Sequence, residues 1–278
     1  MTQRVTITET ELRELYYQQG LNQDQIAQRL GVSQTTVWRR MADFGLLARP
    51  SRLAAPEHLV PPRILENWTP PLAYVVGLVT TDGCLKSDQP KVVDFSSTDQ
   101  VLIDLYQCCL GIAAHVISVR QRTGRQLLSV KVSDAAYRGF LTDVGLKPNK
   151  SCILGALNIP VAVFPDFLRG CVDGDGSIWI TQRQGHPLLG IQIASGSEAF
   201  VAWLQDTVAR LTSIVSHIYR RERRWDLRFN ACYADALAEW MYYTSDVPHL
   251  PRKRAVWEKY RLMVASQERK APFVMDKD

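Results

Sequence analysis

A short pattern that occurs twice constrains the fold of this chain more than any other feature. Each copy is an apolar run with a central glycine, and it ends in an acid followed by a second glycine, at residues 75–83 and 168–176. The central glycines, Gly77 and Gly170, precede the closing glycines by six residues in both copies. Because two helices approach closely only where side chains are small, the matched glycines predict two helices that cross.

Each copy delivers one carboxylate, Asp82 in the first and Asp175 in the second. Crossing helices would bring these carboxylates together at the helix ends. Two neighbouring carboxylates repel each other unless a cation separates them, and Mg²⁺ typically takes one or two carboxylates while water and phosphate oxygens complete its shell. The pattern therefore predicts a paired site for Mg²⁺ or Mn²⁺ that activates water against a phosphodiester. An Asp-Gly pair is also an ordinary helix stop, but the duplication makes that alternative the weaker one.

The two copies also begin longer units that share one order of elements. After the first copy, the sequence predicts a strand at 92–96, a helix at 100–110, a basic hairpin at 116–132 and a helix at 135–144. After the second, the matching segments are 188–194, 198–211, 214–232 and 234–243. In the hairpins, alternation places Val130 and Phe229 inward, and Lys131 and Arg228 outward. We expect a tandem pseudo-repeat of about 100 residues.

Composition narrows the class of protein and of partner. The net charge is +5, and no apolar stretch reaches the roughly 18 residues of a membrane span, so we expect a soluble, cytoplasmic, nucleoid-associated protein without a membrane partner. The six cysteines lack paired CxxC spacing, which favours buried free thiols over zinc sites or disulfides. Local basic stripes fit a polyanion partner, although a solvated hairpin is the alternative for each.

Residues 1–47 predict a compact helical unit ahead of the repeats. Ala27, Gly31 and Val37 stand where a helix-turn-helix needs a small contact residue, a turn glycine and an apolar anchor, and Ser33 suits the N-cap of the second helix. This resembles the helix-turn-helix of bacterial DNA-binding proteins. The expected base-facing residues are Gln34, Thr35, Thr36, Trp38 and Arg39. A three-helix packing module with a solvated polar face is the alternative.

Prolines separate this unit from the repeats, which gives the domain plan. Because proline fixes φ and lacks an N–H, the proline-rich stretch predicts an extended, semi-rigid spacer. The expected domains are a helix-turn-helix at 1–49, the linker at 50–70, repeats at 71–158 and 159–268, and a tail at 269–278.

The helix-then-acid pattern, the element order and the basic phrases at 145–151 and 251–254 together resemble the LAGLIDADG homing endonuclease family, in its single-chain form with two motifs. The resemblance covers about residues 70–265. It implies an α+β fold in which two pseudo-symmetric αββαββα repeats form a DNA-binding saddle. It also implies a monomeric, metal-dependent endonuclease of a mobile element that hydrolyses both strands of a specific double-stranded DNA.

The resemblance also assigns site residues. It implies that Asp82 and Asp175 are catalytic metal ligands and that Lys150 and Lys253 are basic residues near each active centre. Arg252 and Arg254 are alternatives to Lys253, and phosphate contact is an alternative role for all of these cations. The family usually carries another acid two residues before the ligand, which Asp173 matches and Thr80 does not. The expected DNA-binding hairpin residues are Arg120, Arg122, Arg125, Lys131, Arg221, Arg223 and Arg228.

Two other functions fit parts of the sequence. WhiA-type transcription regulators also join a LAGLIDADG-like fold to a helix-turn-helix, and some LAGLIDADG proteins are maturases that bind intron RNA. Retention of both acids favours the nuclease over the regulator, whereas basic hairpins would serve a DNA or an RNA duplex equally.

Overall fold

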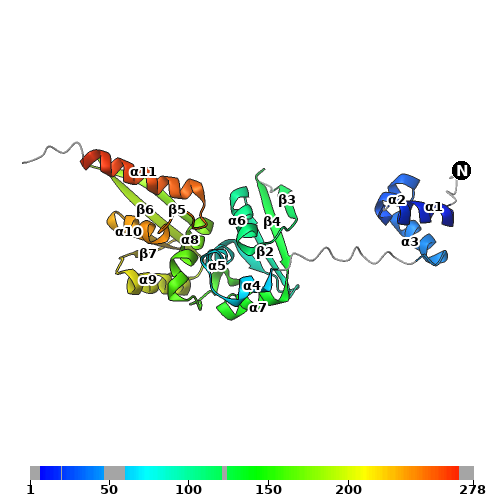
Figure 1. The fold of residues 1–278 in the computed structure, drawn as a ribbon, viewed down its shortest axis with the longest axis horizontal. Helices are drawn as coiled ribbons and strands as arrows, with labels where there is room; N and C mark the ends of the chain where they lie inside the picture. The colour runs from blue at the N-terminus through cyan, green and yellow to red at the C-terminus, as the bar shows by residue number, and fades with distance from the viewer. Residues whose placement is uncertain (1–6, 20, 47–59, 121–123, 269–278) are drawn as a thin grey trace, which may run out of the picture. The chain divides into compact units, whose positions relative to one another are not determined.

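The structure, a computed structural model, describes residues 7–19, 21–46, 60–120 and 124–268 (Figure 1). The chain divides into two compact units, Met1–Pro56 and Glu57–Asp278. Arg122, residues 50–59 of the predicted spacer and the tail at 269–278 lie outside the described residues. Among the helices of the described part, none is both long and apolar enough to cross a membrane.

The first unit is helical, and local capping explains its turns. Its elements are α1 (Glu9–Arg13), a π-helical turn η1 (Glu14–Gln18), α2 (Gln23–Leu30) and α3 (Gln34–Asp43). Gly31 ends α2 with φ +67°, a left-handed conformation that glycine adopts without strain. Ser33 then caps α3 by accepting a hydrogen bond from the Thr36 amide at 3.2 Å, as predicted. Leu12, Ile26 and Val37 form the centre of a small core.

The second unit contains two repeats, each with a four-stranded antiparallel sheet. The first has α4 (Pro62–Glu66), α5 (Pro70–Asp82), β1 (Gly83–Leu85), β2 (Val92–Ser97), α6 (Gln100–Leu110), β3 (Val116–Arg120), β4 (Gln126–Ser133) and α7 (Ala135–Val144). After the short 3-10 turns η2 (Lys150–Cys152) and η3 (Val161–Val163), the second has α8 (Phe164–Asp175), β5 (Gly176–Arg183), β6 (His186–Ser195), α9 (Glu198–Thr212), β7 (His217–Arg220), β8 (Trp225–Asn230), α10 (Cys232–Met241) and α11 (Pro251–Glu268). The strand orders β1-β2-β4-β3 and β5-β6-β8-β7 are the same, which confirms the α+β fold class.

Each sheet has a core face against helices and an outer face. In the first sheet, Phe95 pairs with Val130 and both are fully buried. In the second, Ile193 pairs with Leu227 at the matching place, and both are fully buried. The alternate positions, which include Lys131 and Arg228, lie on the outer faces, as the alternation predicts.

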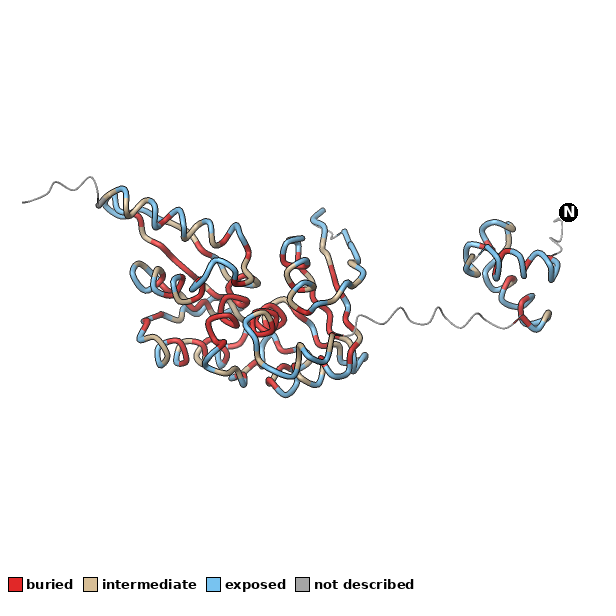
Figure 2. Tube along the Cα trace, in the orientation of Figure 1, coloured by how far each residue is buried: buried red, intermediate tan, exposed pale blue. Residues whose placement is uncertain are grey.

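The two motif helices cross at their glycines. Figure 1 shows α5 and α8 side by side between the two sheets, and Figure 2 shows α5 buried along most of its length. A Cβ atom on Gly77 would lie 2.2 Å from the Phe167 carbonyl oxygen, and one on Gly170 would lie 2.2 Å from that of Tyr74. The backbones are therefore in direct contact, and the predicted crossing is confirmed.

Two sequence expectations need correction. The end of the predicted spacer is folded: Val60 is buried and donates its amide to Asp134 at 2.9 Å, after which Pro62 begins α4. The cysteines are not generally buried, since only Cys171 is buried and Cys109 half-buried, whereas the others are exposed. Cys171 lies on α8 at the helix crossing, with its sulfur 3.8 Å from the Gly77 carbonyl oxygen, and it is fully buried.

Candidate functional site

The two motif acids end the crossed helices and lie close to the same point. Asp82 is the last residue of α5 and Asp175 the last of α8, and each is followed by the glycine that begins a strand. A Cβ on Gly174 would lie 3.2 Å from Asp82 Oδ2, so the end of one helix touches the carboxylate of the other. Asp82 is half-buried and Asp175 is exposed, which leaves the pair open to a ligand from solvent.

The electrostatics of this pair show two competing influences. Partial burial, and then the negative charge of Asp175, raise the pKa of Asp82 to about 6. Loss of water around its carboxylate also raises the pKa of Asp175, although more of this residue reaches solvent. The charges of Lys253 and Lys150 oppose both shifts. Each carboxylate thus lies in a region where negative charge is only partly compensated.

Lys150 and Lys253 lie at the same helix ends, at pseudo-equivalent places. The ammonium of Lys150 donates to the Gly83 carbonyl and, at 3.5 Å, to that of Thr81. Lys253 donates to the carbonyls of Val172, Asp173 and Gly176 at 2.5, 2.9 and 2.7 Å. A helix leaves its last carbonyls without partners, and a cation there is favourable.

Both lysines are buried, and burial disfavours the charged form of their amino groups. It lowers the pKa of both lysines, that of Lys253 to about 8. The structure therefore places both predicted lysines beside the acids but binds their ammonium groups to the main chain. The alternatives point elsewhere: Arg252 pairs with Asp99 at 3.0 Å and Arg254 with Glu258 at 2.7 Å.

The first motif has Thr80 at the position where the second motif has the acid Asp173, and the two positions have different surroundings. Asp173 is fully buried and accepts hydrogen bonds from the Tyr74 hydroxyl at 2.8 Å and the Leu250 amide at 2.7 Å. Burial raises its pKa to about 6, and its Oδ1 has no hydrogen-bond partner. By the same offset of 93 residues, Thr80 matches Asp173 and Phe167 matches Tyr74. Phe167 therefore has no hydroxyl to donate at the matching place, and Thr80 donates to its own helix, to the Val76 carbonyl at 2.7 Å.

The donor set suits a hard divalent cation that keeps much of its water. In the described part of the chain, no three His, Cys, Asp or Glu side chains cluster tightly enough to enclose a metal ion. Two carboxylates whose charges oppose each other fit Mg²⁺ or Mn²⁺, which accepts one or two such ligands beside water and phosphate oxygens. Asp82 and Asp175 are the residues that would hold the ion.

The outer face of the second sheet gathers cations around an acid that the sequence did not indicate. Arg228 lies on this face, and Arg221 and the exposed Arg223 lie in the turn before β8. Asp226 is fully buried among arginines and was missed, because an isolated acid within a basic hairpin looks like an ordinary surface charge.

The outer face of the first sheet is less basic. Lys131 is exposed there and Arg125 is exposed in the hairpin loop, but Arg120 pairs in register with Gln126, on the side of Val116 and Val130 that faces the helices. The outer positions include the exposed Ile117 and Val119, and also Asp94, which accepts from Ser129 Oγ at 2.6 Å. The predicted hairpin residues are therefore not equivalent in the two repeats.

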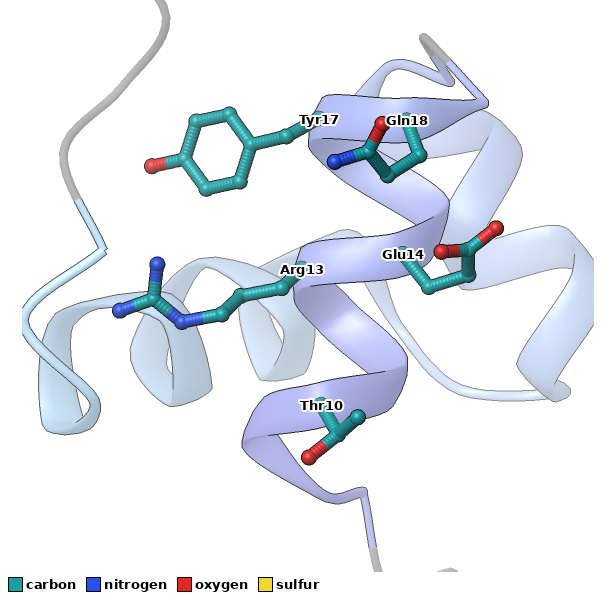
Figure 3. A pocket seen from close by; sticks show the side chains of 5 residues that line it. All are labelled: Thr10, Arg13, Glu14, Tyr17 and Gln18. Atoms are coloured by element: carbon teal, nitrogen blue, oxygen red, sulfur yellow. The ribbon is translucent and has the colours of Figure 1, made fainter.

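The predicted base-facing residues of the first unit lie on α3. Gln34, Thr35, Trp38 and Arg39 are exposed, and Trp38 is 56% exposed despite its size. Thr36 is half-buried, with its hydroxyl 2.8 Å from that of Ser33. Figure 3 shows a shallow hollow elsewhere in this unit, on α1 and η1, and none of the α3 residues lines it. Its lining residues are Thr10, Arg13, Glu14, Tyr17 and Gln18.

Comparison with known proteins finds a family match in the first unit and similar solved structures over most of the chain. Residues 12–44 match the winged helix-turn-helix DNA-binding family. No curated protein sequence matches the chain. Full-length DUF199/WhiA from Thermatoga maritima is similar in structure, with 13% identity and a TM-score of 0.51 over 77% of this chain and 66% of that one. The homing endonuclease I-WcaI, bound to its DNA recognition sequence, has 11% identity and a TM-score of 0.50 over 77% of this chain and 96% of that one.

At these identities the two solved structures show the fold alone, and this chain spans just under two thirds of the length of the WhiA chain. They do not separate a nuclease from a regulator. The chain therefore carries a helix-turn-helix DNA-binding domain and, beyond it, a fold similar to the LAGLIDADG domains of WhiA and of homing endonucleases.

Proposed function

We propose that this protein is a sequence-specific, metal-dependent endonuclease that hydrolyses both strands of double-stranded DNA. The observation that carries the proposal is the pair Asp82 and Asp175, which end two helices whose backbones touch at Gly77 and Gly170. A helix-turn-helix domain and an arginine-rich outer sheet face support DNA as the substrate.

Each part of the centre has a role in this proposal. Asp82 and Asp175 hold Mg²⁺ or Mn²⁺, and such an ion, when bound, activates water and stabilises the departing oxygen. Lys150 and Lys253 hold the helix-to-strand junctions and keep positive charge beside the acids. Since one chain supplies both carboxylates, a monomer would be sufficient, with one acid for each strand.

The proposal is tested by replacing both acids. Asp82→Asn with Asp175→Asn should abolish Mg²⁺-dependent cleavage of DNA that carries the gene's own insertion site, while binding of the same DNA persists. The physical reason is that an amide keeps the shape of the carboxylate but lacks its charge, so it holds a divalent cation poorly. Asp206→Asn, an exposed acid on α9, is the control for the change in charge and should cleave normally. Cleavage by the double variant would exclude the assigned centre.

A DNA-binding regulator is the second candidate, because the similarity to full-length WhiA is as high as that to the nuclease. Tight, specific binding by the wild-type chain without nicking in Mg²⁺ would favour it. An intron-splicing assay run beside the cleavage assay examines the maturase alternative.

A further inference from the structure

A buried acid organises the arginines of the second sheet. Asp226 on β8 is fully buried, yet three arginines pair with it: Arg221 Nε and Arg228 Nη2 lie 3.1 and 3.3 Å from its Oδ2, and Arg224 Nε lies 3.0 Å from its Oδ1. One negative charge cannot neutralise three positive ones. The cluster therefore keeps a net positive charge on the outer face, and Arg221 and Arg228 also donate hydrogen bonds to Asp226.

Arg228 is the most constrained of the three. Besides Asp226, its Nε donates to Gln192 Oε1 at 2.7 Å, and its guanidinium lies over the Tyr219 ring at 5.2 Å. These contacts use two of the five N–H donors of arginine. Its side chain is 29% exposed, against 48% for Arg221 and 56% for Arg224. A side chain held in this way loses little conformational freedom when it binds a ligand.

The place of Arg228 in the sheet brings it near the candidate nuclease centre. It pairs in register with Gln192 on β6, and Gln192 pairs with Ser177 on β5. Ser177 follows Asp175 by two residues, so one row across the sheet joins Arg228 to the strand that begins at this acid. A DNA duplex that reaches Asp175 would therefore have its neighbouring bases close to this row.

The first repeat has no equivalent arginine cluster around a buried acid among its described residues. Because Phe95–Val130 matches Ile193–Leu227, Ser129 occupies the place of Asp226, Asp94 that of Gln192, and Lys131 that of Arg228. Asp94 accepts from Ser129 and pairs with Lys86 at 3.4 Å. The acid has thus moved to the neighbouring strand, and no arginine of the described residues in that sheet pairs with it.

We propose that Asp226 is a positioning residue that fixes Arg228 to read a guanine in the half of the target that the second repeat covers. The proposal rests on the proposed DNA-binding role of the outer sheet faces. A guanidinium presents two parallel donors to the O6 and N7 atoms of guanine in the major groove. The more exposed Arg221 and Arg224 serve the phosphates, which set position rather than sequence.

The test is selection of bound sequences from a randomised duplex library by the full chain, in EDTA to prevent cleavage. The wild type and the control Asp206→Asn should select one common motif. Arg228→Lys should lose the preference for guanine at one position, by about 10- to 100-fold. Asp226→Asn should lose the same preference at the same position, while its affinity for random DNA is unchanged or higher, because its net charge is more positive by one.

Several outcomes would overturn the proposal. If Arg228→Lys selects the same motif as the wild type, Arg228 does not read a base. If Asp226→Asn selects the same motif, Asp226 does not position Arg228. If the two variants lose their preferences at different positions of the target, Asp226 does not act through Arg228. If Asp226→Asn fails to fold, Gln192→Leu removes the other hydrogen bond to Arg228 and should weaken the same preference; no weakening overturns the proposal. If the wild type cleaves DNA in Mg²⁺ but the variants select an unchanged motif, this inference fails and the proposed nuclease function stands. If the variants select a changed motif but the wild type does not cleave, the nuclease function fails and this inference stands.

Discussion

At the scale of single residues, the two crossing helices carry different side chains at matching positions, and these side chains fit each other across the contact. Tyr74 faces Asp173, and Thr81 fills the space that Gly174 leaves, since a Cβ on Gly174 would lie 2.0 Å from Thr81 Oγ1. The sequence alone predicted that the helices cross at the glycines and that the acids lie together, because the spacing of these residues repeats along the chain. It could not predict that Tyr74 donates a hydrogen bond to the buried carboxylate of Asp173, because the two residues are 99 positions apart.

Gly77→Ala should destabilise the protein strongly. The added methyl would meet the Phe167 carbonyl and the Cys171 amide at 2.2 and 2.8 Å, and backbone atoms cannot turn aside as side chains do. We expect a loss of at least about 3 kcal/mol in the free energy of unfolding, at the upper end for overpacking, measured by urea denaturation. Gly139→Ala is the control, because this exposed glycine in α7 has open space around it and alanine favours helix. Equal stability of the two variants would contradict the close crossing.

Tyr74→Phe should expose how Asp173 is stabilised. The Tyr74 hydroxyl helps to lower the pKa of Asp173, so its loss raises that pKa further above about 6. For an acid whose folded pKa exceeds its unfolded one, the native state binds more protons, and stability falls as pH rises through this window. The variant should therefore lose about 1–3 kcal/mol at pH 7 and less at pH 5. Urea denaturation in EDTA at both values checks this, and an equal loss at both would contradict it.

At the scale of elements, the sequence located most helices and strands but missed what depends on tertiary contact. It did not name β1 and β5 as strands, because both begin on the motif glycine and read as the end of a helix. It did not predict the helix α11 and named only the basic phrase at 251–254, because charged residues such as Arg254, Glu258 and Arg261 interrupt the apolar pattern. The place of α8 also depends on a buried cation: Arg169 donates to the carbonyls of Met241 and Pro248, the latter at 2.6 Å, and pairs with Asp166.

Arg169→Met should loosen the attachment of the segment after α10 to α8. It leaves the buried Asp166 without its cation and two carbonyls without a donor, so the free energy of unfolding should fall by about 3–5 kcal/mol. Arg169→Met with Asp166→Asn should recover part of this loss, because the uncompensated charge is removed. Thermal denaturation of both variants measures the difference, and a double variant no more stable than the single one would contradict the electrostatic account.

At the scale of the whole molecule, the two repeats share a topology but not a surface. The strands β5 and β6 have 8 and 10 residues, against 3 and 6 for β1 and β2. The arginine cluster also belongs to the second sheet alone among the described residues. Sequence could indicate the duplication, since the order of elements repeats, but not this difference, because strand length and the face of a side chain depend on pairing.

Removal of residues 1–56 should separate binding from chemistry. The remaining unit contains both carboxylates and its own core, so it should fold and keep metal-dependent cleavage at high DNA concentration. Its apparent affinity should fall by about 10-fold or more, because the tethered helix-turn-helix domain no longer adds a second contact. Fluorescence anisotropy across a salt series measures this, with a shallower salt dependence expected as phosphate contacts are lost. Unchanged affinity would show that the first unit does not bind the same DNA.

The hydrogen bond between Tyr74 and Asp173 also limits how the gene could be divided. Two copies of the first repeat would bring Tyr74 opposite Thr80, without the carboxylate acceptor. Two copies of the second would bury Asp173 against Phe167, without the hydroxyl donor. Either symmetric pair loses a buried hydrogen bond that the mixed pair makes, which costs more than the bond itself stabilises. We therefore expect a symmetric pair of either repeat to be less stable than the mixed pair, because the two halves complement each other at this contact.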